Sequence, residues 1–300
     1  MLLTRRRRRY APPVPGGELT DKVFLITGGA RGIGLETARI AIERGAKVAL
    51  VDLDRDEAGE AATGLGPRAV GLGADVTDRS SIGAAAGEVA ERFGRLDVVV
   101  ANAGITPPKT TTRALDRETW EKVVEVNVLG VYRTVRAGIP NVVASRGQVA
   151  IIASSYSHVN GVLNSSYAVS KSAVEAFARG LSVEMAAHGV GVTTAFFGYV
   201  DTGLIGKAFD EPMADRFRQE VAPGFMTRPI PVGRAAEALV DGIAARRATV
   251  IEPRRWRIPY YLRGLLMPLT DRRLEENLKA RAMIRQIEDR DLTAEGTERG

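Results

Sequence analysis

The chain has no cysteine and only two histidines among its 300 residues. The absence of cysteine excludes disulfides, thiolate catalysis and every cysteine-ligated metal site. His158 and His188 do not stand in a spaced ligand motif, so we expect no metal centre. Apolar runs of the ~18 residues needed to cross a bilayer are also lacking. These absences predict a soluble, cytoplasmic, metal-independent protein without a transmembrane segment.

Positive charge is concentrated at the N-terminus. The sequence has 42 basic and 36 acidic residues, a net charge of +6, and Arg5–Arg9 supply five of those charges. Because the basic excess belongs to this short segment, it is weak evidence for nucleic-acid binding, and we expect no nucleic-acid partner. Residues 1–17 lack apolar periodicity and contain a proline and glycine cluster, so we expect a disordered basic tail. The chain as a whole, 45% hydrophobic and 26% charged, has the composition of a globular protein.

Apolar runs alternate with helical patterns from residue 22 onward. The predicted strands are residues 23–26, 47–51, 68–73, 96–101, 147–153 and 190–196, and the predicted helices are residues 33–44, 55–63, 79–93, 117–137 and 166–187. Strands that are apolar throughout and separated by helices indicate a parallel sheet covered on both faces. We therefore expect an α/β fold with a Rossmann-like, doubly wound sheet in one domain, residues 18–252, and ligands at the carboxyl ends of its strands.

A glycine-rich turn, TGGARGIG at residues 27–34, separates the first strand from the first helix. Its candidate phosphate-binding residues are Gly28, Arg31, Gly32, Ile33 and Gly34. Glycines let the backbone approach a pyrophosphate closely, and the helix N-terminus offers free N–H groups and the positive end of a dipole. This strand, loop and helix predict a dinucleotide site.

Asp52 ends the second predicted strand, 24 residues after Gly28. A carboxylate there can accept hydrogen bonds from the adenosine ribose hydroxyls, and it repels the additional phosphate of NADP. Arg31 favours the opposite choice, because its guanidinium could pair with that phosphate. We give Asp52 more weight, since it is expected to occupy the hydroxyl site itself, and predict NAD over NADP.

Tyr167 and Lys171 are four residues apart on a predicted helix and so share one face, with Cβ atoms on the order of 5–6 Å apart. A tyrosine with a pKa near ~10 is a poor base at neutral pH, but a nearby ammonium stabilises its phenolate and lowers that pKa. The pair can then exchange protons with an alcohol or a carbonyl. The same spacing also occurs in ordinary amphipathic contacts, so the neighbouring motifs decide between the two interpretations.

These motifs, taken in order, resemble those of the short-chain dehydrogenase/reductase family over roughly residues 20–250. The glycine-rich turn matches the family's Thr-Gly-x-x-x-Gly-x-Gly, and Tyr167-x-x-x-Lys171 matches its active-site motif. Further matches are Asp75-Val76, which in the family contacts the adenine ring, Asn102-Ala103-Gly104, which borders the cofactor, and Asn127, whose helix carbonyl holds a proton-relay water.

The resemblance implies four catalytic residues, Asn127, Ser154, Tyr167 and Lys171. The family serine commonly precedes the tyrosine by 13 residues, which selects Ser154, and a shift of one residue would select Ser155. By resemblance, Tyr167 exchanges a proton with the substrate oxygen and Ser154 hydrogen-bonds the same oxygen. Lys171 lowers the pKa of the tyrosine and bonds the nicotinamide ribose, so Tyr167 and Lys171 also contact the cofactor.

One segment departs from the family pattern. Many members have Pro-Gly after the sixth strand, and this chain has Phe197-Gly198. Val200 and Thr202, which follow, are still expected to meet the nicotinamide carboxamide, although the turn can differ.

The segments around the site allow more than one interpretation. Residues 203–228 occupy the place of the family's substrate lid, and their apolar side chains could line a pocket for a hydrophobic substrate or pack against the body of the protein. The C-terminal extension, residues 253–300, mixes arginines with apolar residues. It could bind a membrane surface, cover the substrate pocket or pack on a neighbouring subunit, and we favour packing. His158 is expected on a solvent-exposed loop.

The sequence thus predicts an NAD(H)-dependent oxidoreductase that interconverts a secondary alcohol and a ketone. An NADPH-dependent carbonyl reductase of the same fold is the alternative, and a non-catalytic dinucleotide sensor is the alternative from a different class. The resemblance also implies a homodimer or homotetramer paired through residues 117–137 and 166–187.

Overall fold

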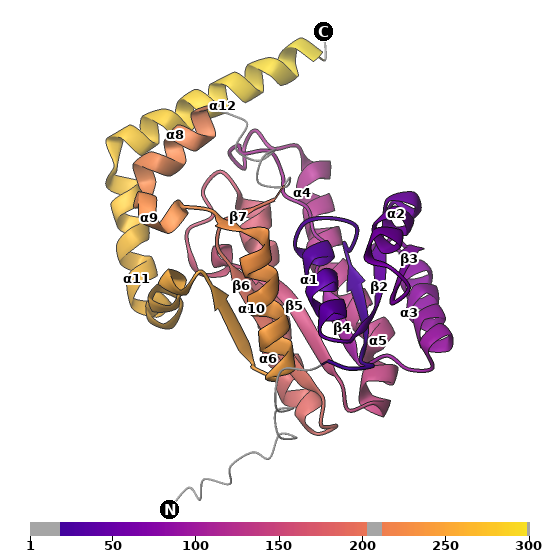
Figure 1. Ribbon diagram of the computed structural model, residues 1–300. Coiled ribbons are helices and arrows are strands. Elements are labelled where there is room, and N and C mark those ends of the chain that lie inside the picture. Colours follow the sequence, from indigo (N-terminus) through magenta and orange to yellow (C-terminus); the bar gives the residue numbers. More distant parts are fainter. Residues whose placement is uncertain (1–18, 203–211, 299–300) are drawn as a thin grey trace, which may run out of the picture.

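The computed structural model describes residues 19–202 and 212–298, and its centre is a parallel seven-stranded sheet (Figure 1). The strand order is β3-β2-β1-β4-β5-β6-β9. The strands are β1 (Val23–Thr27), β2 (Lys47–Asp52), β3 (Ala69–Gly73), β4 (Val98–Ala101), β5 (Gln148–Ser154), β6 (Gly191–Phe197) and β9 (Thr249–Glu252). The order reverses beside β1, which is the arrangement of a doubly wound sheet, so the predicted fold class is confirmed.

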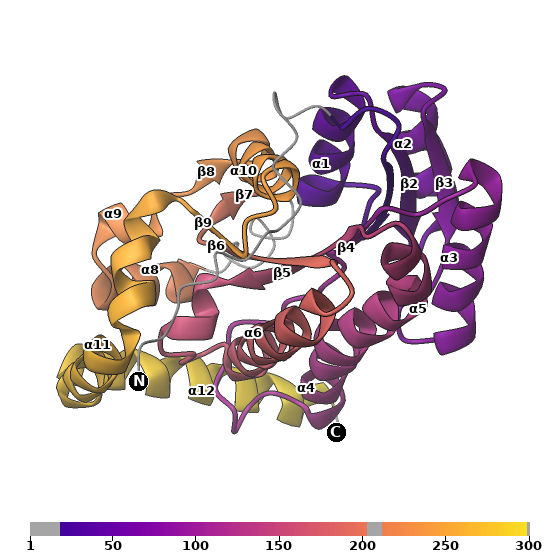
Figure 2. The same cartoon turned by 90° about the horizontal axis from the view of Figure 1, so that it is seen from below.

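Helices cover both faces of the sheet, because successive residues of a strand point to opposite sides (Figure 2). In β1, Val23 and Leu25 belong to the core under α3, α5 and α6, and Phe24 and Ile26 belong to the core under α1, α2 and α10. The bounds are α3 (Arg79–Phe93), α5 (Val131–Ala144) and α6 (Ser165–Ala186) on the first face, and α1 (Gly32–Glu43), α2 (Arg55–Leu65) and α10 (Val232–Ala244) on the second.

The predicted elements are present between residues 23 and 197, and most of their ends differ from the structure by a residue or two. The predicted helix at 117–137 is the exception. It consists of α4 (Arg117–Val124), a π-helical segment (Glu125–Gly130) and α5, which continues to Ala144. Strand β9 forms one edge of the sheet, and helix α10 packs on one of its faces. The predicted tail at residues 1–17 lies outside the described residues.

Part of the predicted lid, residues 203–211, also lies outside the described residues. The remainder forms α8 (Pro212–Val221) and α9 (Gly224–Thr227), connected to the body through the short pair β7 (Val200–Asp201) and β8 (Ile230–Pro231). Phe217 of α8 is buried in a cluster with Ala280 and Ile287 of the C-terminal extension. This part of the lid therefore packs against the extension, a surface that neither of the two sequence interpretations named.

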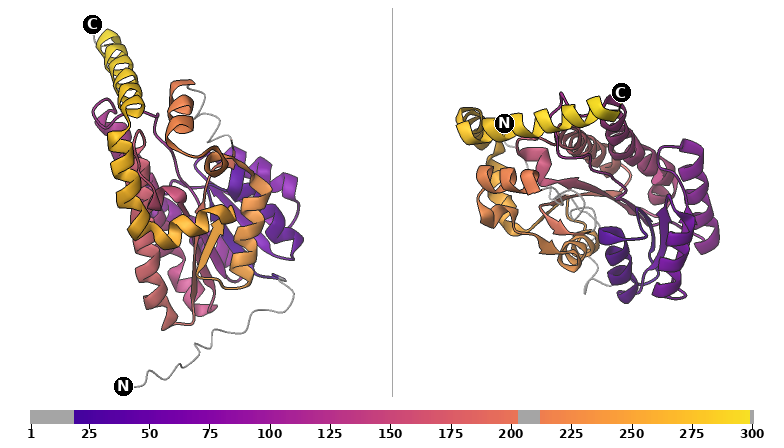
Figure 3. Two further views of the ribbon diagram at one scale, coloured as in Figure 1. Left: turned by 90° about the vertical axis from the view of Figure 1, so that its left-hand side faces the viewer. Right: turned by 90° about the horizontal axis from the view of Figure 1, so that it is seen from above.

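The C-terminal extension runs along one side of the molecule as a 3-10 turn (η3, Arg254–Trp256) and two helices, α11 (Arg257–Glu276) and α12 (Leu278–Glu298) (Figure 3). Glu288 of α12 accepts hydrogen bonds from Thr111 at 2.7 Å and Arg113 at 2.8 Å. These bonds attach α12 to the loop that follows β4. Helix α12 thus packs on its own chain, whereas packing on a neighbouring subunit was the interpretation favoured from the sequence.

Helix α11 packs on the body through some of its side chains and leaves several large apolar ones exposed. Tyr260 packs against Phe196, and Arg263 pairs with Glu175 of α6. The exposed apolar side chains of α11 are Ile258, Tyr261, Leu262, Leu265 and Leu269. None of the helices within the described ranges is long and apolar enough to cross a membrane.

Asp97 joins the starting ends of β1 and β4, at the end of the sheet opposite the predicted site. Its side chain is 1% exposed and accepts hydrogen bonds from the Val23 amide at 3.0 Å and from Arg95 Nε at 2.7 Å. Lys22 Nζ approaches the same carboxylate at 3.2 Å. Burial acts to raise the pKa of Asp97, but the bonds to Arg95 and Val23 dominate and lower it.

We predict that Asp97→Asn lowers the free energy of unfolding at neutral pH by about 1–3 kcal/mol, because it removes a buried charge with two cationic partners. Since the folded pKa lies below the unfolded one, this stabilisation is present above the ordinary pKa of aspartate and is lost as the pH falls through the lower folded value. Urea unfolding of both proteins at several pH values measures the difference. Asp21→Asn, at an exposed carboxylate with only long ion pairs, is the control and should change stability little. Equal stability of Asp97→Asn and wild type at neutral pH would contradict this account.

Candidate active site

The carboxyl ends of β1, β2, β4 and β5 meet at one edge of the sheet, beside the point where the strand order reverses. Ligands of doubly wound folds bind at this point because loops diverge to opposite faces there and leave a crevice. All the candidate residues of the glycine-rich turn, and Asp52, Asn102 and Ser154, follow or end these strands.

The glycine-rich turn after β1 has the shape that a dinucleotide phosphate needs. Gly28 and Gly32 have φ values of +62° and +56°, which L side chains rarely adopt. A Cβ on Gly34 would lie 2.2 Å from the Gly28 carbonyl oxygen, so only glycine fits there. Helix α1 begins without a side-chain cap and without an acidic residue in its first turn. Its N–H groups and positive dipole end are therefore available to an anion, and the cradle fits a pyrophosphate.

Asn102 holds this turn against β4. Its Nδ2 donates hydrogen bonds to the Thr27 carbonyl at 2.9 Å and to the Gly28 carbonyl at 3.0 Å. The Thr27 hydroxyl accepts in return from the backbone N–H of Asn102 at 3.2 Å and of Ala103 at 3.3 Å. The Asn-Ala-Gly segment thus fixes the turn from the neighbouring strand.

Asp52 and Arg31 take different positions at the end of β2. The Asp52 carboxylate accepts a hydrogen bond from the Ala30 backbone N–H at 3.0 Å, so it lies directly against the turn. The Arg31 guanidinium approaches Glu57 at 3.8 Å, and its side chain is 77% exposed. Asp52 is therefore held by the turn, whereas Arg31 extends toward solvent beside another carboxylate.

The remaining candidate cofactor residues border the same crevice. Asp75 accepts from the Thr77 backbone and hydroxyl, both at 2.7 Å, which orders the turn after β3. The side chain of Val76, the next residue, packs closely against Gly130, where an added Cβ would lie 2.8 Å from Val76 Cγ2. Thr202 lies near Gly32, with its Cγ2 3.7 Å from where a Cβ of that glycine would stand. Thr202 is thereby brought to the phosphate-binding turn.

Phe197 is the last residue of β6, and its ring is buried in the core. The strand continues to this residue, which pairs with Ser154 of β5. Gly198 after it packs against Trp256, where a Cβ would be 2.5 Å from the indole nitrogen. The departure from Pro-Gly therefore leaves an extended strand end that is covered by the C-terminal extension.

Tyr167, Lys171 and Ser154 come together between α6 and β5. Lys171 is 4% exposed, its Nζ donates to the Ile152 carbonyl at 3.0 Å, and it lies 5.5 Å from the centroid of the Tyr167 ring. Ser154 ends β5, hydrogen-bonds Tyr167 and donates to the Phe197 carbonyl at 3.3 Å. Of the two serines weighed from the sequence, Ser154 has this bond to the tyrosine.

Burial dominates the protonation of this pair in the protein alone. It raises the pKa of Tyr167 to about 12, although the hydrogen bond with Ser154 lowers it. Burial also lowers the pKa of Lys171 to about 8. Both shifts follow from the cost of holding a charge away from water, so each side chain gains from an opposite charge on the other.

Asn127 lies behind the pair in the π-helical segment. Its side chain exchanges two hydrogen bonds with the backbone of Ile105, at 2.8 and 2.9 Å, and donates to the Ser170 hydroxyl at 3.1 Å. Gly104 leaves the space through which Asn127 and Lys171 approach each other, since its Cβ would meet both side chains. A π-helical turn disturbs the regular carbonyl bonding of a helix, and such turns often occur at functional sites.

Sequence analysis missed three polar neighbours of this site and misplaced a fourth residue. Ser170 links Asn127 to the Tyr167 carbonyl, Tyr199 hydrogen-bonds Tyr156, and Lys109 lies beside Tyr167. The expectation of a solvent-exposed His158 is wrong. Its side chain is 2% exposed because Trp256 and Tyr260 of the extension pack around it.

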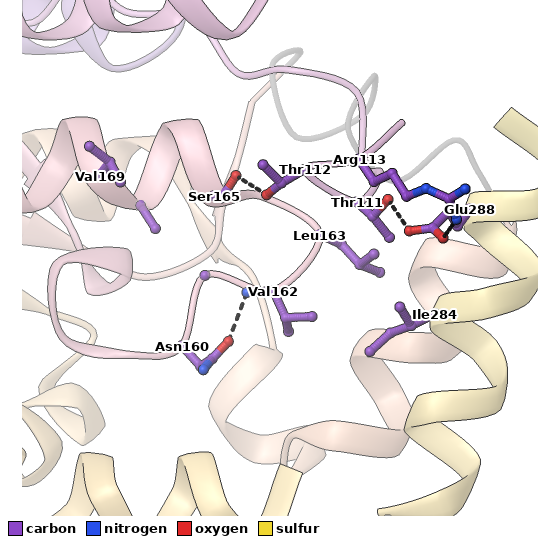
Figure 4. A pocket seen from close by; sticks show the side chains of 12 residues that line it. Thr111, Thr112, Arg113, Asn160, Val162, Leu163, Ser165, Val169, Ile284 and Glu288 are labelled. Carbon is purple, nitrogen blue, oxygen red and sulfur yellow. Dashed lines mark hydrogen bonds and ion pairs between the residues drawn. The ribbon is translucent and has the colours of Figure 1, made fainter. Parts of the chain in front are cut away.

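A hollow of about 590 Å³ opens beside the site, between residues 111–113, residues 160–169 and α12 (Figure 4). Val162, Leu163 and Ile284 contribute apolar surface, and the ion pair of Arg113 and Glu288 lies at one side. Among its described lining residues are Ser165 and Ala168 from the first turn of α6, which also carries Tyr167. The hollow therefore neighbours the tyrosine without containing it.

We predict that Asn102→Ala weakens dinucleotide binding and lowers the free energy of unfolding by about 1–2 kcal/mol, because two carbonyls of the turn lose their donors. Urea unfolding and a fluorescence titration with NADH measure the two effects. Asn141→Ala in α5, close to Ser145 at the opposite end of the sheet, is the matched control and should leave NADH binding unchanged. Unaltered NADH binding in Asn102→Ala would refute the role given to this side chain.

Comparisons with known proteins agree with this geometry. The sequence pattern of the short chain dehydrogenases matches residues 22–212. Cis-4-hydroxycyclohexanecarboxylate dehydrogenase from Sinomonas cyclohexanicum is 34% identical over 234 residues, which are 77% of this chain and 93% of that protein. L-fucose dehydrogenase from Rattus norvegicus is 32% identical over 233 residues, 75% of this chain and 85% of that protein. A solved short-chain type dehydrogenase/reductase from Mycobacterium marinum has a TM-score of 0.69 and 26% identity, and the match covers 78% of this chain and 95% of that one. The chain therefore belongs to the short-chain dehydrogenase/reductase family of NAD(P)-dependent oxidoreductases.

Proposed function

We propose that this protein is an NAD(H)-dependent oxidoreductase that interconverts a secondary alcohol and the corresponding ketone. The observation that carries the proposal is the contact of Tyr167 with both Lys171 and Ser154, next to a glycine-rich turn that fits a pyrophosphate. A tyrosine close to both a cation and a hydroxyl is equipped to move a proton to or from a substrate oxygen.

In the proposed mechanism, each side chain has one task. A bound nicotinamide supplies or accepts the hydride. Tyr167 donates its proton to the carbonyl oxygen in reduction and removes the hydroxyl proton in oxidation. Ser154 hydrogen-bonds the same oxygen and stabilises the charge that develops on it. The Lys171 ammonium, 5.5 Å from the Tyr167 ring centroid, is proposed to favour the phenolate against the burial that raises the pKa of Tyr167. A helix carbonyl of the segment around Asn127 is proposed to hold the proton-relay water, as the family resemblance implies.

The preference for NAD over NADP rests on Asp52. Its carboxylate is held against the turn by the Ala30 N–H, where it repels an additional phosphate. Arg31, which favours NADP, is 77% exposed and lies near the carboxylate of Glu57. The adenosine half of the cofactor is assigned to the glycine-rich turn, Asp75, Val76 and the Asn102–Gly104 segment, and the nicotinamide half to Val200 and Thr202.

A small alcohol or ketone is the proposed substrate class. The two relatives described above are a dehydrogenase of a hydroxycyclohexanecarboxylate and a dehydrogenase of L-fucose, both of which are small oxygenated molecules. A homodimer or homotetramer is the proposed assembly, and it is supported by the exposed Leu129, Tyr132 and Val183 near or on the helices that pair in the family. A cytoplasmic location stays a prediction of the sequence.

We predict that Tyr167→Phe abolishes hydride transfer and still binds NADH, because it removes the proton donor and keeps the ring. The change in NADH absorbance with a panel of secondary alcohols and ketones measures turnover, and fluorescence measures binding. Tyr132→Phe, at an exposed ring on α5, is the matched control and should retain turnover. If Tyr167→Phe turned over substrate at the wild-type rate, this tyrosine would be excluded as the acid and base. If the wild type turned over none of the alcohols and ketones, the proposed reaction would be contradicted.

We also predict that Asp52→Asn shifts the preference toward NADPH. The amide oxygen can still accept the Ala30 N–H, so the turn is kept while the negative charge is removed. The ratio of kcat/KM with NADPH to that with NADH should rise about 10-fold or more, as expected for a lost charge repulsion. Asp54→Asn, at a helix cap close by, is the charge-matched control. An unchanged ratio in Asp52→Asn would remove Asp52 as the selector.

A further inference from the structure

Lys109 lies on the loop after β4 and faces the proposed acid–base residue. Its ammonium nitrogen is 5.9 Å from the centroid of the Tyr167 ring and 5.8 Å from that of the Tyr156 ring. The two rings meet edge to face, with centroids 5.5 Å apart. The Lys109 Nζ also donates a hydrogen bond to the Thr106 hydroxyl at 3.2 Å. Lys109 is thus the second lysine beside Tyr167, on a different element from Lys171.

Two other cations near this site, among the residues that the structure describes, have partners within the protein. Arg218 of α8, which lies over the Tyr199 ring, is paired with Asp215. Lys171 donates to the Ile152 carbonyl. Among the described ranges of the chain, no carboxylate pairs with Lys109, whose hydrogen-bond partner is the neutral hydroxyl of Thr106. A cation in such a place has capacity left for an anion that comes from outside the protein.

In the environment of Lys109, a bound anion would strongly stabilise the charged form of the amine. Burial lowers the pKa of its amine to about 7, because the charged form loses water and has no compensating carboxylate. A bound anion would restore the charge and form a charge-assisted hydrogen bond with little competing water. The two neighbouring rings alone give the ammonium a weaker, cation–π attraction.

We propose that Lys109 binds a carboxylate of the substrate, so that the protein acts on hydroxy acids and keto acids. This inference rests on the proposed function, since it places the anion beside the tyrosine that handles the substrate oxygen. Because the Lys109 Nζ lies 5.9 Å from the Tyr167 ring centroid, a substrate that reaches both groups would join its carboxylate to the reacting carbon by a short carbon frame. A purely apolar substrate, one of the sequence expectations, would offer this ammonium no anion, and within the described residues its hydrogen-bond partner is the neutral Thr106 hydroxyl.

Matched pairs of substrates test the inference. The probes are β-hydroxybutyrate, γ-hydroxyvalerate and a cyclohexanol bearing a carboxylate, each compared with its uncharged methyl ester. We expect wild type to prefer the acids, and Lys109→Met to lower the acid-to-ester ratio of kcat/KM by about 10- to 100-fold, the effect of one lost charge-assisted hydrogen bond. Any general loss of activity affects acid and ester alike and cancels in this ratio.

Two further variants bracket the result. Lys109→Arg keeps the charge and should retain much of the acid preference. Lys122→Met removes a lysine from the exposed surface of α4 and should match wild type. An acid-to-ester ratio in Lys109→Met equal to that of wild type, or an ester preference in wild type, would overturn the inference while the proposed function stands.

The pH dependence of the same ratio is a second readout. The ratio for wild type should fall as the pH rises through the Lys109 pKa of about 7, and it should be flat in Lys109→Met. Within the part of the chain that the structure describes, the titratable groups that face Lys109 are Tyr156 and Tyr167, with Lys171 and Tyr199 beyond them and Arg218 over Tyr199. Their effect on the reacting oxygen is common to acid and ester, so it cancels too.

A measurement without turnover separates this inference from the proposed function. The rate at which a small acylating reagent modifies Lys109, read by mass spectrometry, reports how much free amine is present and accessible. Cyclohexanecarboxylate should slow this modification, cyclohexanecarboxamide should not, and Lys122 should respond to neither. No effect of the carboxylate would contradict the anion site even if no substrate is found. Protection by the carboxylate together with no turnover of any alcohol or ketone would support the site and count against the proposed function.

Discussion

The buried ammonium of Lys171 connects the sheet to the helix that carries the proposed acid–base residue. Its bond to the Ile152 carbonyl joins α6 to β5, and this places Tyr167 beside Ser154, which ends the same strand. The charge is expensive to bury, and it is tolerated because a carbonyl and a tyrosine ring surround it. The absence of a side chain at Gly104 leaves room for Lys171 and Asn127 to approach each other, since a Cβ there would lie 3.7 Å from the Lys171 Nζ and 3.2 Å from the Asn127 Oδ1.

A second set of contacts fixes the cofactor crevice relative to that amine. Asn102 attaches the glycine-rich turn to β4, and the loop that begins there passes Asn127 and reaches Lys109. The distance between the phosphate cradle and the proton-transfer group is therefore determined by neighbouring strands of one rigid sheet. The loop after β4 can then determine which substrate is accepted without altering that distance. Glu288 of the C-terminal extension holds the other side of this loop.

The periodic part of the fold could be predicted from sequence because the inner strands of the central sheet are buried on both faces and each glycine of the turn has a backbone reason. The same holds for Tyr167 and Lys171, whose spacing follows from helix geometry. The edge strand β9 was not among the predicted strands. Contacts between distant segments could not be predicted in this way. His158 looked like an exposed loop residue, and it is buried only because Trp256 and Tyr260 return to cover it. The π-helical segment around Asn127 and the position of Lys109 beside Tyr167 likewise depend on tertiary packing that no local pattern records.

In the proposed reaction, the crevice at the carboxyl ends of β1, β2 and β4 binds the nicotinamide dinucleotide that exchanges a hydride with the substrate, while Tyr167 exchanges the proton. Fluorescence titration of the purified protein with NADH and with NADPH tests it most directly. The account predicts saturable binding of NADH and weaker binding of NADPH, since the Asp52 carboxylate lies against the turn. Binding of neither dinucleotide to well-folded protein would contradict it.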